Sequence, residues 1–378
     1  MKITSSELPE IILMPFDRGS FTFTMFEIAG DLPEDFAACF LPGKAGTLDS
    51  VSAETQLGWV TGKHLLDTNI DEATIVRGGA YCLTLRQAVR KIPASLLNAL
   101  CMREEQAFLA ANPGRDYVSG KDKKRIKEDV TERHINKMPP ALSGIPMVLE
   151  PHTKLLYLGT ASQTQIDLFV DQFYRATKLE LIQLTPALIL DREFHTTPAA
   201  LPVLELSGYP NAPVEPAIGR DFLTWLLYYC EKVGKVTIGS NDFDAMIEDP
   251  LQLAGDGDAL GSGEAVIKKG DSPIRSAEVK AALSVGKKLR KAKVSLTRDD
   301  NSIWSGTFDA DNFVFGSFKL PESEEMNPDE VFADRVRALG DFREAWIEYF
   351  KLFAKAMLEN YEETLADMRK WVQEREAI

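Results

Sequence analysis

Lysine and arginine side chains are concentrated in two stretches of the sequence. Residues 119–137 hold seven basic and four acidic side chains, and residues 268–298 hold ten basic and two acidic ones. Cations at this density attract phosphate, and phosphate contacts bind nucleic acid without reading its bases. The chain as a whole has a formal net charge of −14. A local basic surface still governs binding, because charges are screened over about 8–10 Å. The sequence therefore predicts polyanion-binding surfaces on an acidic body.

The second basic stretch contains a segment, residues 287–297, with the polar and apolar alternation of a β-strand. Alternation assigns Lys291, Lys293, Ser295 and Thr297 to one face, and Arg290, Ala292, Val294 and Leu296 to the other. The first face is polar and cationic. Most residues of the second face are apolar and are expected to pack in the core. We expect Lys291 and Lys293 to contact phosphate.

The first basic stretch has helical spacing. Lys123, Lys124 and Lys127 cluster on one side of such a helix, while Ile126 and Val130 turn inward. A solvated helix with internal ion pairs, such as Lys124 with Glu128, is an equally good interpretation of this pattern taken alone.

The sequence lacks the well-defined catalytic motifs of common enzyme families. It contains no P-loop, no G-x-G-x-x-G after a strand, no G-x-S-x-G and no H-E-x-x-H. The four histidines lie too far apart to form a local metal pair on a helix: His64, His134, His152 and His195. The glycine- and aspartate-rich residues 255–263 lack the spacing of an EF-hand loop and favour a turn. No catalytic or metal-binding residue is nominated.

Composition indicates a globular protein that remains in the cytoplasm. The chain has 378 residues, 44% of them hydrophobic, and no apolar run long enough to span a membrane. The first residues lack the pattern of a signal peptide. The four cysteines form no C-x-x-C pair and are expected to be free thiols: Cys39, Cys82, Cys101 and Cys230.

Periodicity and capping signals predict a mixture of strands and helices. Strands are expected at residues 20–28, 56–60, 80–86, 155–158, 287–297, 303–308 and 313–320. Helices are expected after Pro93, Ser119, Ser162, Ser276 and Asn327, and at residues 222–230. The last helix carries an apolar stripe almost to the C-terminus, which is typical of a core helix. Trp59, in a short apolar strand, is expected to pack rather than to stack on a base.

These elements predict an α+β fold of antiparallel sheets with packed helices. Three consecutive regions are expected: residues 1–189 with the lysine-rich helix, an irregular connector at 190–263 with one apolar helix, and residues 264–378 with the basic strand and the long helix.

Four stretches resemble the RdgC family of recombination-associated proteins. They are GWV at residues 58–60, SGKDKKRIKEDVTERHINKMPPALS at 119–143, LYLGTASQTQIDLF at 156–169 and VIKKGDSPIRSAEVKAALSVGKKLRKAKVSL at 266–296. The resemblance is colinear over most of the chain, and each motif is individually loose.

The resemblance implies a ring-shaped homodimer with a basic central channel. Such proteins bind double-stranded and single-stranded DNA with little sequence preference, associate with the nucleoid and restrain RecA, without cofactor or enzymatic activity. By position, the resemblance nominates these DNA-binding residues: Lys121, Lys123, Lys124, Arg125, Lys127, Lys268, Lys269, Lys287 and Lys288. Where the family often has Pro-Arg-Ala-Phe, thought to help close the ring, this chain has Pro139, Pro140, Ala141 and Leu142.

Two other functions remain open from the sequence. The surplus of acidic residues is compatible with a metal-dependent nuclease or another recombination enzyme, whose metal site only the fold would assemble. The apolar C-terminal helix is compatible with a protein-interaction module that does not bind DNA.

Overall fold

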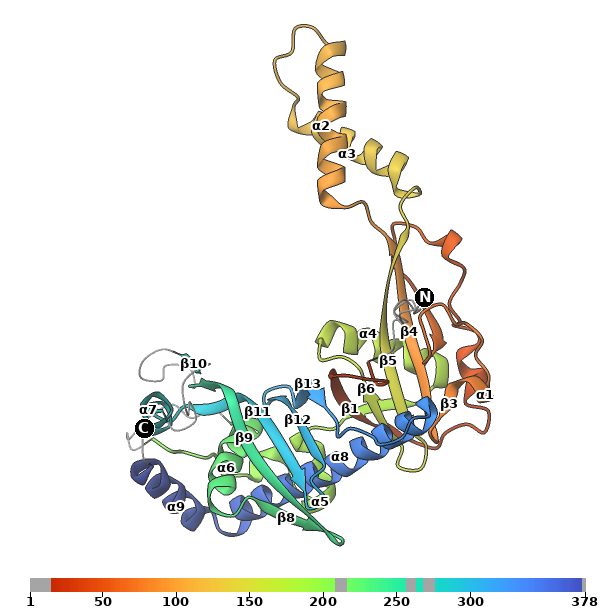
Figure 1. The fold of residues 1–378 in the computed structure, drawn as a ribbon. Helices are drawn as coiled ribbons and strands as arrows, with labels where there is room; N and C mark the ends of the chain where they lie inside the picture. Colours follow the sequence, from red (N-terminus) through yellow and green to blue (C-terminus); the bar gives the residue numbers. More distant parts are fainter. Residues whose placement is uncertain (1–14, 208–215, 256–262, 268–275, 376–378) are drawn as a thin grey trace, which may run out of the picture. The chain divides into compact units, whose positions relative to one another are not determined.

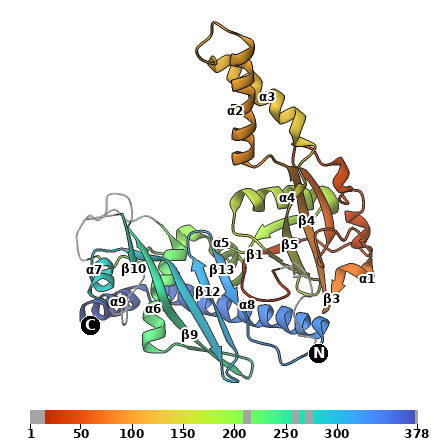
Figure 2. The same ribbon diagram turned by 45° about the horizontal axis from the view of Figure 1, so that its top comes forward.

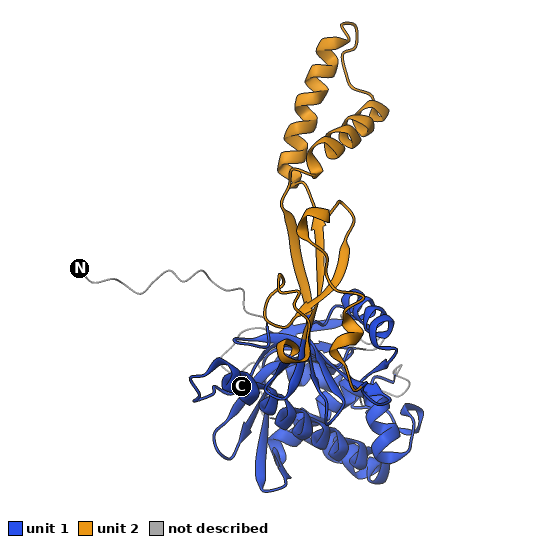
Figure 3. Ribbon diagram, turned by 90° about the vertical axis from the view of Figure 1, so that its right-hand side faces the viewer, with its two compact units in different colours: residues 1–33, 76–82, 146–378 blue, residues 34–75, 83–145 orange. Residues whose placement is uncertain are grey.

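The computed structural model describes residues 15–207, 216–255, 263–267 and 276–375 and combines helices with antiparallel strands (Figure 1). The predicted α+β class is therefore confirmed. The chain forms two compact units, coloured separately in Figure 3: unit 1 comprises residues 1–33, 76–82 and 146–378, and unit 2 comprises 34–75 and 83–145. This differs from the three consecutive regions expected, because β4 (Ala80–Arg90) and β5 (Pro140–Glu150) each belong in part to both units.

Unit 1 is built on an antiparallel sheet. Its strands follow the order β10 (Glu264–Ile267), β9 (Asn241–Ala254), β11 (Lys288–Arg298), β12 (Ile303–Asp309), β13 (Val314–Lys319), β1 (Phe21–Ala29), β6 (Leu155–Leu158) and the end of β5. Three short strands add to it: β7 (Glu180–Gln183) on β1, β8 (Lys235–Ile238) on β9, and β3 (Val76–Arg77) on β4. Residues 190–263, expected to be an irregular connector, therefore supply β8 and β9.

Helices pack on this sheet and complete the core of unit 1. They are α4 (Gln163–Thr177), α5 (Pro186–Phe194), α6 (Ile218–Lys232), α7 (Ala277–Ser284), α8 (Pro328–Glu359) and α9 (Tyr361–Glu374). Figure 2 shows α8 running along the sheet behind β12 and β13. Phe222 of α6 meets Trp346 of α8 edge to face, with ring centroids 5.2 Å apart, and Trp346 also packs on Phe308.

The C-terminal stripe is core, as its spacing predicted. Phe332, Trp346 and Phe353 are buried, and the Asn327 side chain caps α8 by accepting a hydrogen bond from the backbone N–H of Asp329 at 3.0 Å. The single helix expected here is two helices, which meet at Asn360. None of the helices within the described residues combines the length and apolar character needed to cross a membrane.

Unit 2 contains one small core and a helical hairpin. Its elements are the 3-10 turns η1 (Ala37–Phe40) and η2 (Leu48–Ser50), β2 (Gln56–Thr61), α1 (Glu72–Ile75), the later part of β4, α2 (Ala94–Ala111), α3 (Gly120–Ile135) and the start of β5. Trp59 is buried on β2, as expected, and packs edge to face on Phe40. Gly58 must be glycine, because a Cβ there would lie 2.3 Å from the Cα of Ala45.

Candidate nucleic-acid interface

The hairpin of α2 and α3 carries most of the exposed cations predicted to bind DNA. The two helices pack against each other (Figure 1): Leu97, Leu100 and Phe108 of α2 are partly buried against a cluster formed by Val118, Ile126 and Val130. Ile126 and Val130 face inward, as their spacing predicted. These α2 side chains are only partly buried, and α2 has no fully buried residue. The hairpin is therefore mostly surface.

Local sequence determines where α3 begins. The Ser119 hydroxyl accepts a hydrogen bond from the backbone N–H of Asp122 at 3.2 Å and donates one to its carboxylate at 2.7 Å. This is the predicted N-cap. The Ser119 hydroxyl, followed by Arg115 and Arg125, lowers the pKa of Asp122. Asp122 therefore stays ionised at the positive end of the helix dipole, where a negative charge is stabilising.

Five cations follow this cap within two helical turns, and all are exposed: Lys121, Lys123, Lys124, Arg125 and Lys127. Lys121 and Lys123 lie in the first turn, where the helix dipole favours acidic side chains instead. Exposed cations at the unfavourable end of a helix are compatible with a binding role.

Three of the five have acidic neighbours. Lys123 lies 3.3 Å from Glu105, Lys124 lies 3.9 Å from Glu128, and Arg125 lies 3.5 Å from Asp122. Such exposed pairs are weak and are easily exchanged for phosphate. Within the described part of the chain, no carboxylate oxygen lies within 4.0 Å of the amines of Lys121 and Lys127. The cluster thus retains cations available to a polyanion.

The lysines of β11 are placed differently. Lys291 and Lys293 share one half-exposed face of the strand, as alternation predicted, but each meets a carboxylate from a neighbouring strand. The Lys291 amine lies 2.7 Å from Asp309 on β12, and the Lys293 amine lies 2.6 Å from Glu248 on β9. The face is charge-compensated rather than cationic, which argues against the phosphate-binding face expected from alternation.

Glu248 shows the strength of this compensation. Burial would raise its pKa, but hydrogen bonds from Lys293 and Ser295 outweigh burial and lower the pKa below its ordinary value. The stability from this pair is present above the pKa of an unfolded glutamate, about 4.3, and is lost as the pH falls through the lowered folded value. The pair is therefore intact at neutral pH.

Lys287, Lys288 and Arg290 also depart from expectation. Lys287 and Lys288 are buried, and the Lys288 amine lies 2.6 Å from the buried carboxylate of Asp221 on α6. A buried, paired ammonium cannot reach phosphate, so Lys288 has a structural role. The register of β11 shifts at Arg290, which leaves the packing face and pairs with Glu264 and Asp311. Lys268 and Lys269 lie outside the described residues.

A Lys291→Gln/Lys293→Gln variant tests this correction. Two half-exposed ion pairs are lost, so the free energy of unfolding should fall by roughly 1 kcal/mol, while the salt dependence of DNA binding should not change. Urea unfolding and binding titrations across salt measure the two effects. If the slope of log DNA affinity against log salt concentration instead flattens by about one to two units, both lysines contact phosphate, as their alternation alone suggested.

One further cation near the cluster was not nominated from the sequence. Arg115, in the loop before α3, is more than half exposed and lies 3.1 Å from Asp122. Arg115 lies four residues before the Ser119 cap. This closeness in sequence to the lysine-rich helix was the signal that could have identified it. Arg115 and Arg125 therefore share one carboxylate.

Among its described residues, the structure contains no group of three or more histidine, cysteine, aspartate or glutamate side chains that is able to hold a metal ion. The four cysteines are free, and burial raises the pKa of Cys82 to about 12, so this thiol is not a nucleophile at neutral pH.

Comparison with models of known protein families finds no match to this chain, and comparison with curated proteins finds no significant match either.

Proposed function

We propose that the protein binds DNA without sequence preference through the cationic cluster of α3, defined as Lys121, Lys123, Lys124, Arg125 and Lys127. The supporting observation is the exposure of these five side chains in the first two turns of the helix, where Lys121 and Lys123 also oppose the helix dipole. Lysine amines act as point charges toward phosphate and carry no information about the base sequence. We therefore expect the protein to bind both double-stranded and single-stranded DNA.

We further propose, from the resemblance to RdgC, that the protein is a nucleoid-associated factor in DNA recombination or replication that encircles DNA as a homodimer and restrains RecA. The hairpin supports self-association, because it leaves large apolar side chains exposed at Leu96, Met102 and Tyr117. Two-fold pairing is the commonest way for such a surface to be covered.

The dimer is tested by light scattering. The mass in solution should be about twice 42.0 kDa at micromolar concentration. Leu96→Ser/Met102→Ser should lower it toward one chain if the hairpin supplies the contact. A wild-type protein that is strictly monomeric at this concentration would rule out the ring while leaving DNA binding open.

DNA binding itself is tested by mobility-shift titrations of labelled duplex and single strand across salt. Affinity should fall steeply with salt and be similar for unrelated sequences. The same titration in magnesium tests the enzymatic alternative, since loss of the labelled duplex would indicate a nuclease. If neither duplex nor single-stranded DNA is bound at low salt, only the protein-interaction hypothesis remains.

A further inference from the structure

Unit 2 carries a second surface whose charge is opposite to that of α3. Residues 34–75 contain seven acidic and two basic side chains. They enclose a hollow of about 420 Å³ lined by Glu34, Asp35, Ala37, Ala38, Leu41, Ile70, Asp71 and Glu72. We call it the acidic groove. Because its carboxylates repel phosphate, it is not a continuation of the DNA-binding surface.

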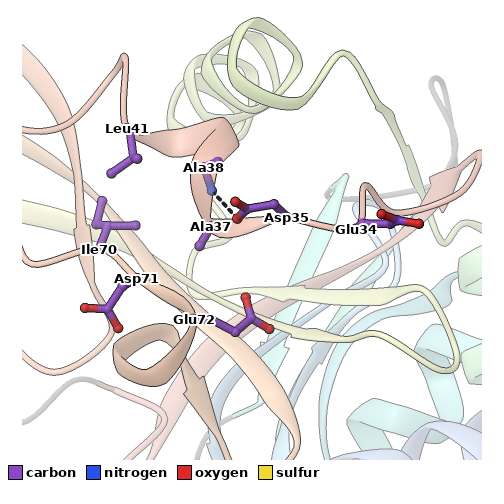
Figure 4. A pocket seen from close by; sticks show the side chains of 8 residues that line it. All are labelled: Glu34, Asp35, Ala37, Ala38, Leu41, Ile70, Asp71 and Glu72. Atoms are coloured by element: carbon purple, nitrogen blue, oxygen red, sulfur yellow. Dashed lines mark hydrogen bonds between the residues drawn. The ribbon is translucent and has the colours of Figure 1, made fainter.

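Apolar residues form part of the lining of the groove. Figure 4 shows Leu41 and Ile70 together at one end of it, with Asp35 and Glu72 toward the other. Leu41 is 48% exposed, although it directly follows the buried Phe40. A leucine left open to water inside a hollow offers a contact for an apolar side chain of a partner.

Two of the four carboxylates are fixed by the local fold. Asp35 accepts a hydrogen bond from the backbone N–H of Ala38 at 3.0 Å, and Asp71 accepts one from that of Thr74 at 2.9 Å. These bonds orient the carboxylates while their charge remains. Acidic side chains that surround a groove without converging on one point suit several separate cations better than a single metal ion.

We propose that the acidic groove docks a short cationic segment of a different protein, with one apolar side chain between lysines or arginines. The apolar side chain contacts Leu41, beside the buried Ile70, and the flanking cations lie near the carboxylates of the rim. The cationic helix α3 of a second copy is a poor occupant, because its apolar side chains Ile126 and Val130 are already packed in the hairpin. The occupant is therefore a separate basic peptide.

Fluorescence anisotropy with labelled, amidated peptides tests this proposal on the full-length protein. At about 0.05 M salt, KRLKR should bind saturably and more tightly than KRSKR, and EELEE should not bind. Glu34→Gln/Glu72→Gln and Leu41→Ser should each weaken KRLKR about five-fold. The matched control is Asp49→Asn/Glu54→Gln, which removes two charges of the same unit outside the groove and should change affinity by less than about two-fold.

Three outcomes overturn the proposal. They are no saturable binding of KRLKR, equal affinity for KRLKR and KRSKR, and equal loss in the control and groove variants. Melting curves establish that each variant is folded, and Leu41→Ser provides a second route if the charge variant is unstable. DNA affinity should be unchanged in Leu41→Ser, so failure of the groove leaves the proposed DNA binding untouched.

Discussion

A Lys121→Gln/Lys124→Gln/Lys127→Gln variant is expected to bind duplex and single-stranded DNA about 10²-fold more weakly than the wild type at about 0.1 M salt. Each phosphate contact by a lysine contributes about 0.9 to the slope of log affinity against log salt for duplex DNA, so three contacts account for this loss. The slope should flatten by up to about three units for each protomer that contacts the DNA, and all sequences should be affected alike. Mobility-shift titrations at several salt concentrations measure both quantities.

The same variant separates a binding role from a structural one. Removal of cations from the first turns of α3 relieves their repulsion by the helix dipole, so thermal stability should be unchanged or slightly higher. Lys319→Gln/Lys355→Gln/Lys370→Gln is the matched control, with the same change of charge on exposed residues of unit 1. Unaltered affinity and slope in the α3 variant would contradict the proposed interface, as would an equal loss in the control.

Most elements of unit 1 were predictable because their signals are local. The strands β1, β6, β11, β12 and β13 follow from alternation and turn residues, and α8 follows from the Asn327 cap. The long strand β9 was missed. Its buried residues Phe243, Ala245 and Ile247 do alternate with exposed ones, but the exposed Met246, Pro250 and several acidic side chains disguise the pattern. Its pairing with β8, β10 and β11 explains why the segment is a strand.

The candidate interface was likewise predictable only where its signals are local in sequence. The helix α3 was found because its cap, its lysines and its inward residues lie within one segment. The pairing of Lys293 with Glu248 was not, because alternation assigns a face to a residue but does not identify its neighbours on other strands. The burial of Lys288 depends on Asp221, 67 positions earlier in the chain. Long-range contacts thus decide which cations remain available.

Trp59→Ala is expected to lower the free energy of unfolding of unit 2 by about 3–5 kcal/mol, the usual cost of truncating a buried tryptophan. Trp59 is 2% exposed, and its ring meets the Phe40 ring at 4.8 Å. The backbone is held as well, since its N–H donates to the carbonyl of Gly43 and its carbonyl accepts from Ala45, each at 2.9 Å. Alanine therefore leaves a cavity in a strand that cannot move to fill it.

Trp59→Phe is the control for this prediction, because phenylalanine keeps an aromatic side chain against Phe40 and should cost less than alanine. Chemical unfolding followed by circular dichroism, together with single-strand titrations below the transition, measures stability and DNA affinity separately. Affinity should be retained wherever the variant is folded, since a ring that is 2% exposed has no face open to a base. A sharp loss of single-strand affinity with unchanged stability would instead assign Trp59 to stacking on DNA, and the packing role would be wrong.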